Sequence, residues 1–271
     1  AFGTSAPELA VSVTAALKGS NEIAVGNVLG SNIFNLLVVA GLSAVLCPLV
    51  VDRDILRRDW PLSIAAAGLL TVMLLFGGGI TRWEGLLLLV LFVWLMIVQV
   101  RPALRNRAVS APSGAEELAE AMPPVMIGVN IVLGLICIVM GGQLSVNGAT
   151  GIARMFGLSE TLIGLTIVAI GTSLPELVTS LVAAKKGEND IAMGNVIGSN
   201  LFNILLILGA SALISPITVL PTAVIDSAIL TILSIAFLLL AMKGKMSRPV
   251  GAVMALCYVG FTAYLILRSA M

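Results

Sequence analysis

The sequence Gly-Thr-Ser-Ala-Pro-Glu at residues 3–8 returns as Gly-Thr-Ser-Leu-Pro-Glu at residues 171–176. The decamer GNVLGSNIFN at residues 26–35 likewise returns as GNVIGSNLFN at residues 194–203. The two copies align without a gap over 46 positions, of which about 27 are identical. Packing alone rarely requires a glutamate, a proline and several asparagines to recur in otherwise apolar sequence. The duplication therefore predicts one site built from two halves of the chain.

The composition is that of a membrane protein. Hydrophobic residues make up 59% of the chain, charged residues make up 11%, and the mean hydropathy is +1.10. Because about 20 helical residues cross the hydrocarbon core of a bilayer, long apolar stretches indicate membrane spans. We expect nine such spans, the first of them incomplete, at residues 1–17, 23–46, 60–76, 83–100, 124–146, 158–184, 190–214, 222–242 and 249–267. The predicted fold class is an all-α polytopic membrane protein.

The two copies of the motif are predicted to enter the membrane from opposite sides. The second copy follows the first by an offset of five spans, and an odd offset reverses direction, as in the inverted-topology repeats of secondary transporters. We divide the chain into a first repeat half at 1–100, a linker at 101–123 and a second repeat half at 124–271. By symmetry the first half lacks about 45 N-terminal residues. We therefore expect a complete molecule of five plus five spans, about nine of them represented here.

The charges orient the chain and narrow its function. A net charge of +1 leaves no basic footprint for a nucleic acid. If the linker is cytoplasmic, 11 of the 15 Lys and Arg residues fall at cytoplasmic ends, in agreement with the positive-inside bias. We expect a multi-pass protein of the inner (plasma) membrane, surrounded by lipid, with no obligate protein partner. The chain has no His, and Cys47, Cys137 and Cys257 are isolated in apolar sequence, so we expect no cofactor and no disulfide.

Each copy of the first motif predicts a broken helix with a carboxylate beside the break. Proline lacks an N–H and clashes with the carbonyl four residues earlier, so Pro7 and Pro175 loosen the turns that precede them. Inside a membrane, freed carbonyls are tolerated only against protein or a polar cavity. A structural kink explains the prolines, but it does not explain the costly charges of Glu8 and Glu176. Carbonyls, hydroxyls and a carboxylate on one turn are ligands that suit a hard cation.

The second motif predicts a polar face on the following helix. Positions four apart fall on one face of a helix, and this spacing groups Asn27 with Ser31 and Asn35, and Asn195 with Ser199 and Asn203. Such asparagines can simply bond to neighbouring helices, and we leave this interpretation open for Asn27, Asn195, Asn32 and Asn200. Ligation or lining of the site is the interpretation that we favour for Ser31, Ser199, Asn35 and Asn203.

The paired blocks GTSAPELAVS…GNVLGSNIFN and GTSLPELVTS…GNVIGSNLFN resemble the two α-repeats of the sodium/calcium exchanger family, in its prokaryotic form, within the Ca²⁺:cation antiporters. The resemblance implies that the four repeat helices pack at the centre. It also implies a Ca²⁺ site formed by the carboxylates of Glu8 and Glu176 with the carbonyls of Thr4 and Thr172. It implies flanking Na⁺ sites from the side chains of Ser5, Ser173, Ser31 and Ser199 and the backbone oxygens of Ala1 and Ala169.

One position departs from the family pattern. The residue 27 positions after the second glutamate is Asn203, whereas well-known exchangers of this family carry Asp there. The first copy has Asn35 at the equivalent position. The predicted site therefore offers two carboxylates instead of three, which leaves the counter-ion and the stoichiometry open.

The leading hypothesis is a secondary active antiporter, not an enzyme, that exchanges Ca²⁺ for Na⁺ through a two-glutamate site near the membrane midplane. Two bidentate glutamates and two carbonyls supply about six of the six to eight oxygens that Ca²⁺ prefers. Protons can neutralise the same carboxylates, so a Ca²⁺/H⁺ exchanger is the alternative. An intramembrane hydrolase would need a metal-binding His or an activated nucleophile, and neither is evident. A purely structural helical bundle would leave the duplicated glutamates unexplained.

Overall fold

The computed structural model describes residues 2–106 and 160–269, together with separate positions between 123 and 157. Within these residues, six helices are long and apolar enough to cross a membrane, and a bent helix pair raises this number to seven. The predicted all-α polytopic class is confirmed. The predicted span at 124–146 and the linker from residue 107 to 122 lie outside the continuously described residues.

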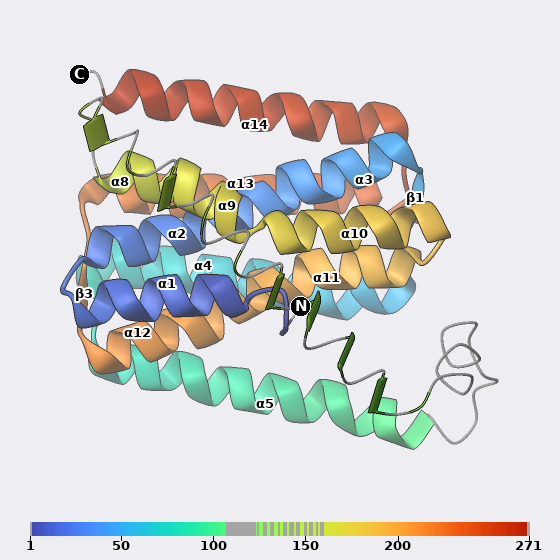
Figure 1. Ribbon diagram of the computed structural model, residues 1–271, viewed down its shortest axis with the longest axis horizontal. Coiled ribbons are helices and arrows are strands. Elements are labelled where there is room, and N and C mark those ends of the chain that lie inside the picture. The colour runs from blue at the N-terminus through green and yellow to red at the C-terminus, as the bar shows by residue number, and fades with distance from the viewer. Residues whose placement is uncertain are drawn as a thin grey trace.

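The helices follow the predicted spans closely (Figure 1). The first half contains α1 (Ala6–Leu17), α2 (Asn21–Phe34), η1 (Asn35–Val39), α3 (Ala40–Leu46), η2 (Ile55–Asp59), α4 (Trp60–Gly77) and α5 (Arg82–Asn106). The second half contains α8 (Glu160–Ile163), η3 (Gly164–Val168), α9 (Ala169–Thr172), α10 (Leu174–Lys186), α11 (Asn189–Phe202), η4 (Asn203–Leu208), α12 (Gly209–Ile214), α13 (Pro221–Ala241) and α14 (Arg248–Ser269). Helix α5 thus continues for six residues into the segment that the sequence assigned to the linker.

The predicted helix break at Pro175 is present, whereas at Pro7 the structure shows a helix that begins after a turn at residues 2–5. Helix α9 ends at Thr172, α10 begins at Leu174, and the two helical segments on either side of this break are bent by 50°. Pro175 lies in the first turn of α10, and Pro7 lies in the first turn of α1. A proline is tolerated there because the first N–H groups of a helix have no partner within it.

Four short π-helical segments, labelled η, interrupt the helices of the described residues, and the sequence did not predict them. Two of them, η1 and η4, begin at Asn35 and Asn203, the equivalent positions of the two repeats. A π-turn widens a helix by one residue, and such turns occur frequently at functional sites. Each long span that carries the second motif is therefore α-helical before its last asparagine and widened directly after it.

Two short antiparallel ladders join the halves at opposite ends of the bundle. Strand β1 (Leu49–Val50) pairs with β4 (Lys245–Met246), and β2 (Gly79–Ile80) pairs with β3 (Ile217–Thr218). Strands β1 and β3 occupy equivalent positions in the two repeats, and Figure 1 shows them at opposite ends of the helices. This placement is what an inverted-topology repeat requires. The two-residue strands themselves were not anticipated.

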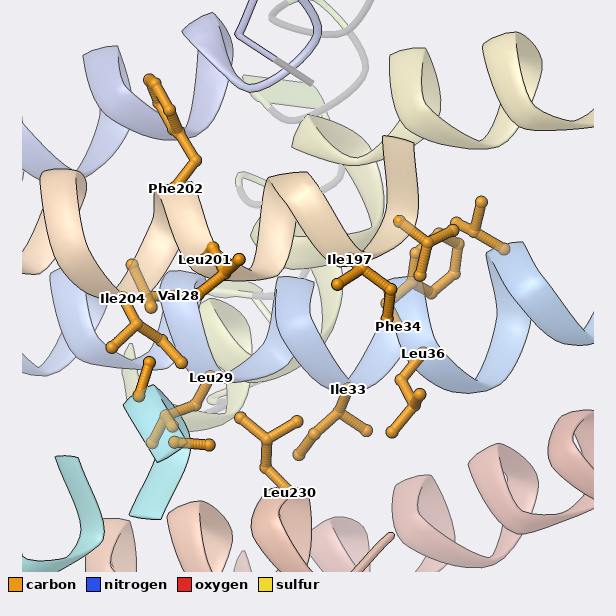
Figure 2. Packing of buried hydrophobic residues seen from close by; sticks show 14 of the residues in the cluster. Val28, Leu29, Ile33, Phe34, Leu36, Ile197, Leu201, Phe202, Ile204 and Leu230 are labelled. Atoms are coloured by element: carbon orange, nitrogen blue, oxygen red, sulfur yellow. The ribbon is translucent and has the colours of Figure 1, made fainter. Parts of the chain in front are cut away.

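The apolar core lies where the second-motif helices of the two halves meet. Val28 and Leu29 of α2 belong to one buried cluster with Ile197 and Leu201 of α11 (Figure 2). Leu230 of α13 lies against the other side of α2 in the same view. This packing fixes the position of the polar residues on the remaining faces of α2 and α11.

The outer helices α5 and α14 lie at opposite edges of the molecule (Figure 1). Each packs through glycines, as close helix approach in membranes requires. A Cβ added at Gly85 of α5 would lie 2.9 Å from the carbonyl oxygen of Gly209 in α12. A Cβ added at Gly251 of α14 would clash with the carbonyl oxygen of Gly41 in α3. The pseudo-symmetry of the sequence therefore extends to helix packing.

Candidate functional site

The two glutamates are fully buried and are held by serines of the opposite repeat. Glu8 and Glu176 both have 0% of their surface exposed. Ser5 Oγ donates a hydrogen bond to Glu176 Oε1 over 2.7 Å, and Ser173 Oγ donates to Glu8 Oε1 over 2.9 Å. Each serine precedes a proline at a helix break, so the breaks place the hydroxyls. The two copies of the first motif thus meet and exchange donors.

The second oxygen of each carboxylate has no hydrogen-bond partner among the described residues. These atoms are Glu8 Oε2 and Glu176 Oε2, and both are buried. Buried polar atoms are normally satisfied, and an uncompensated buried carboxylate costs several kcal/mol. The described residues contain no group of three or more His, Cys, Asp and Glu side chains that could hold a metal ion. In the described part of the chain, the negative charge of the site therefore comes from these two carboxylates, surrounded by hydroxyl and amide groups.

Asn27 joins three helices of the site. Its Nδ2 donates to the backbone oxygen of Glu8 over 3.3 Å and to Ser12 Oγ over 2.9 Å, both in α1. Its Oδ1 accepts a hydrogen bond from Thr172 Oγ1 over 3.1 Å, at the end of α9. All three hydrogen bonds of this amide are buried. Asn27 therefore connects the first glutamate helix to the helix break of the second repeat.

Asn195 makes the equivalent contacts in the second repeat. Its Nδ2 donates to the backbone oxygen of Glu176 over 3.3 Å and to Ser180 Oγ over 3.1 Å. Its Oδ1 accepts from Thr4 Oγ1 over 3.1 Å. We call Asn27 and Asn195, with these six hydrogen bonds, the asparagine clasps. The threonine side chains of the first motif thus hold the clasps.

Asn32 and Asn200 form a reciprocal bridge between α2 and α11. Asn32 Nδ2 donates to the backbone oxygen of Asn200 over 3.3 Å, and Asn200 Nδ2 donates to that of Asn32 over 3.2 Å. For all four asparagines whose role the sequence left open, the hydrogen bonds therefore favour the helix-bonding interpretation.

The four residues for which we favoured ligation or lining have unequal surroundings. Ser199 Oγ donates to Glu176 Oε1 over 3.2 Å, whereas Ser31 Oγ lies 3.5 Å from the backbone oxygen of Ala169. Asn203 Nδ2 donates to Asn32 Oδ1 over 2.9 Å, and its own Oδ1 is buried without a partner in the described structure. Asn35 is fully buried, and neither of its amide atoms has a partner there.

The resemblance implied two backbone oxygens as Na⁺ ligands, and the structure describes only one of them. Ala169 O accepts from Thr172 Oγ1 over 3.3 Å and from the backbone N–H of Ser173 over 3.1 Å. Ala1, its counterpart, lies outside the described residues. The helix break next to Ala169 therefore uses this carbonyl to close the last turn of α9.

A buried ion pair in the outer helices was missed from the sequence. Arg268 Nη1 of α14 donates to Asp226 Oδ1 of α13 over 2.8 Å, and Asp226 is 1% exposed. A signal was present, because Asp226 is the one charged residue in the predicted span 222–242, and a charge within a span usually has a partner. The pair links α13 to α14, and it lies outside the cluster around the two glutamates.

Known proteins match this chain over most of its length. The family described as sodium/calcium exchanger protein matches residues 1–101 and 126–267. The "Putative antiporter CaxA" of Alkalimonas amylolytica is 42% identical over 99% of this chain and 86% of its own length. The inner membrane protein YrbG of Escherichia coli is 38% identical over 97% of this chain and 82% of its own. A solved structure of the sodium-calcium exchanger NCX_Mj matches with a TM-score of 0.77 and 32% identity, over 96% of this chain and 83% of that one.

Proposed function

This chain belongs to the sodium/calcium exchanger family and is a multi-pass membrane antiporter of Ca²⁺ and other cations, and we propose that it exchanges Ca²⁺ for Na⁺ through a site centred on Glu8 and Glu176. The observation that carries this proposal is the pair of buried carboxylate oxygens, Oε2 of each glutamate, without a protein partner among the described residues. Two such oxygens at the centre of a helical bundle are matched by a bound cation.

The proposed ligands combine side chains and backbone. Both carboxylates would bind Ca²⁺, with the backbone carbonyls of Thr4 and Thr172 beside the helix breaks. This set suits Ca²⁺, which accepts six to eight oxygens in flexible geometry, better than Mg²⁺, which keeps its waters and demands a tight octahedron. Serine hydroxyls around the carboxylates are the proposed Na⁺ ligands, namely Ser5, Ser173, Ser31 and Ser199. Asn35 and Asn203 add amide oxygens to the lining.

Exchange follows from mutually exclusive neutralisation of the same two carboxylates. Ca²⁺ and Na⁺ would each remove the charge of the site, and a site that holds neither would cross the membrane interior only at a large desolvation cost. The inverted repeat supplies the alternating access, since one half can rock against the other around a fixed central site. A Ca²⁺/H⁺ exchanger remains the second candidate, because protons can neutralise both glutamates as well.

Ca²⁺ uptake into proteoliposomes tests the function and separates the two counter-ions. Vesicles containing the purified protein are loaded with Na⁺ and diluted into Na⁺-free buffer with radiolabelled Ca²⁺, and a parallel set carries an outward proton gradient instead. We expect the Na⁺ gradient to drive uptake and the proton gradient to leave it at background. Uptake driven only by protons would replace Na⁺ by H⁺ in the proposal, and no uptake under either gradient would refute it.

The site assignment is tested by Glu176→Gln, which removes charge but keeps volume. We expect Ca²⁺ uptake to fall at least about 100-fold, because a buried, charged partner of the ion costs about 3–5 kcal/mol when it is removed. Glu188→Gln is the matched control, since Glu188 is an exposed glutamate near the start of α11. Thermal unfolding in detergent should be similar for both variants. Wild-type uptake by the Glu176 variant would refute the assignment.

We also propose that residues 101–123 are a linker between the two halves that faces the cytoplasm, as the distribution of Lys and Arg favours. The test replaces the three cysteines by alanine and then introduces Lys18→Cys and Lys186→Cys separately. These lysines occupy equivalent positions in the two repeats. In intact cells, an impermeant maleimide should label the cysteine at position 18 and spare the one at position 186. Labelling of both would contradict the proposed orientation.

A further inference from the structure

We infer that two serines outside the repeated motifs, Ser43 and Ser211, contact the transported ions on their way to and from the central site. Ser43 serves one membrane face, and Ser211 serves the opposite face. The inference rests on the proposed function, because it adds residues to the same transport. Its basis is a pair of buried hydroxyl groups, at equivalent positions of the two repeats, that have no partner in the described structure.

The hydroxyls of Ser43 and Ser211 are buried without the local hydrogen bond that such groups usually make. Both side chains are 0% exposed, and neither Oγ atom has a partner among the described residues. A hydroxyl within a helix can donate to a carbonyl three or four residues earlier, and Thr71, Ser227 and Thr231 do so over 2.9 Å. Because the two unpartnered oxygens are already enclosed by the protein, a small guest such as water or an ion can supply the missing bond.

The π-helical segments turn each serine onto the same face as the last asparagine of the second motif. Ser43 follows Asn35 by eight residues, and eight residues of a regular α-helix make about 2.2 turns, which would place Ser43 about 80° to one side. Segment η1 lies between them, and a π-turn contains one residue more than an α-turn. The eight residues then make about two full turns. The same holds for Asn203 and Ser211 across η4, so each polar face continues about 12 Å beyond its asparagine.

Each serine lies on the side of its helix that packs against the glutamate helix of the other repeat. Helix α3 packs between α14 and α10, and α12 packs between α5 and α1 (Figure 1). Gly41 marks the side of α3 toward α14, since a Cβ there would lie 3.0 Å from the carbonyl oxygen of Gly251. Ser43 comes two residues later, about 200° around the helix, and therefore lies on the side toward α10. Gly209 marks the side of α12 toward α5, so Ser211 lies on the side toward α1.

The two helix interfaces lead from the glutamates to opposite ends of the bundle. Helix α10 carries Glu176 in its first turn, and α3 ends within one turn after Ser43, shortly before β1. Helix α1 carries Glu8 in its first turn, and α12 ends within one turn after Ser211, shortly before β3. Strands β1 and β3 lie at opposite ends of the helices (Figure 1). An ion that leaves along either interface therefore passes one of the serines about one turn before the helix ends.

A hydroxyl at this point replaces a water molecule of the ion. A cation that enters an apolar interface loses part of its hydration, and oxygen ligands along the way offset this loss. Alanine would occupy the same place in the packing but could not offer an oxygen. The two serines also differ in timing, because each can act only while the site is open toward its own end of the bundle. This sidedness distinguishes a role in transport from a role in packing.

Cysteine labelling tests whether the enclosed serines become accessible, and it does not depend on which ions are carried. In a protein whose three cysteines are replaced by alanine, Ser43→Cys, Ser211→Cys and Ser227→Cys are introduced separately. We expect a charged, impermeant methanethiosulfonate to modify position 43 from one membrane face and position 211 from the opposite face. Position 227 is equally buried but bonded within α13, and it should resist the reagent. Resistance of positions 43 and 211 at both faces, or modification of both from the same face, would overturn the inference.

Ser43→Ala and Ser211→Ala test whether the hydroxyls act on the ion. Ca²⁺ uptake is measured in right-side-out and in everted membrane vesicles, which present opposite faces to added Ca²⁺, and vesicles without the protein give the background. We expect each variant to raise the apparent KM for Ca²⁺ about fivefold at one face, a factor typical of one lost hydrogen bond, and the two variants to act at opposite faces. Ser227→Ala is the control and should leave KM unchanged at both faces.

The outcomes separate this inference from the proposed function. Wild-type uptake combined with unchanged KM values in both serine variants, or with equal changes at the two faces, would overturn the inference and leave the proposed exchange intact. The absence of Ca²⁺ uptake by the wild-type protein at either face would overturn the proposed function and, with it, the contact of these serines with ions.

Discussion

The two halves of the site have nearly the same sequence but different hydrogen bonds. Glu176 accepts from two serines, Ser5 over 2.7 Å and Ser199 over 3.2 Å. Within the described part of the chain, Glu8 accepts from one serine, Ser173, while the counterpart of Ser199, which is Ser31, lies against a backbone oxygen. The sequence repeat therefore does not produce a symmetric site. Among the described residues, the second glutamate thus has one serine donor more than the first.

The asparagines include one pair with equivalent hydrogen bonds in the two repeats and one pair with different hydrogen bonds. The clasps of Asn27 and Asn195 are equivalent bond for bond. In contrast, Asn203 donates to Asn32, whereas neither amide atom of Asn35 has a partner in the described structure. The parts that hold helices together are therefore symmetric, and the parts beside the carboxylates are not. This difference separates the helix-bonding positions of the repeated motif from those that the proposed function assigns to the ion.

The largest effect on stability is expected from the clasps. Asn27→Leu removes three buried hydrogen bonds, and Asn195→Leu removes two buried and one partly buried hydrogen bond. Interhelical hydrogen bonds in membranes contribute about 0.6 kcal/mol each on average. We expect each variant to lower the free energy of unfolding by about 2 kcal/mol, and the two losses to be equal. Chemical unfolding in detergent measures this quantity.

The matched control for the clasps is Asn21→Leu at the start of α2. Asn21 makes one hydrogen bond in the described structure, to the backbone oxygen of Pro216. We therefore expect Asn21→Leu to lower the free energy of unfolding less than either clasp variant does. Clearly different losses in the free energy of unfolding for the two clasp variants would contradict the symmetry that the hydrogen bonds indicate. Losses no greater than that of the control would show that the clasps contribute little to stability.

A smaller effect, on ion affinity, is expected from the serines that cross between the repeats. Ser173→Ala removes the serine that donates to Glu8 in the described structure, and a hydrogen bond to a charged group contributes about 1.5–3 kcal/mol. We expect Ca²⁺ affinity to fall about tenfold in this variant. Ser5→Ala should lower Ca²⁺ affinity less, because Ser199 still donates a hydrogen bond to Glu176. Isothermal titration of the detergent-solubilised protein measures both affinities.

The relative loss of Ca²⁺ affinity in Ser5→Ala and Ser173→Ala tests whether the two glutamates are held differently. If Ser5→Ala weakens Ca²⁺ binding more than Ser173→Ala does, the second glutamate is not the better-held one. The double variant Ser5→Ala with Ser199→Ala provides the check, because it removes both serines from Glu176. We expect its affinity to fall at least as far as that of the Ser173 variant.

Most of the fold could be predicted from local sequence. The spans follow from the length of the apolar stretches, and the helix breaks follow from Pro7 and Pro175, because proline acts on the turn that contains it. The inverted repeat follows from an odd number of spans between the copies. The π-helical segments at Asn35 and Asn203 could not be predicted, since the same residues fit an α-helix and packing decides between the two.

Only part of the pairing between polar groups could be predicted from the sequence. The sequence singled out the glutamates, serines and asparagines, because packing alone rarely requires polar residues to recur in apolar sequence. It did not show that Ser5 and Ser173 would each hold the glutamate of the other repeat, nor that Asp226 would pair with Arg268. These contacts join residues 42 to 171 positions apart, and their distances depend on how whole helices pack.

What the sequence by itself determined is therefore the membrane-spanning inverted repeat, the two helix breaks and the set of polar residues at its centre. Local covalent geometry and the period of the helix are sufficient for these features. Only the tertiary structure decided which oxygens are satisfied by the protein and which have no partner among the described residues. That decision depends on a few hydrogen bonds of about 3 Å between the two halves, and a local pattern carries no information on such distances.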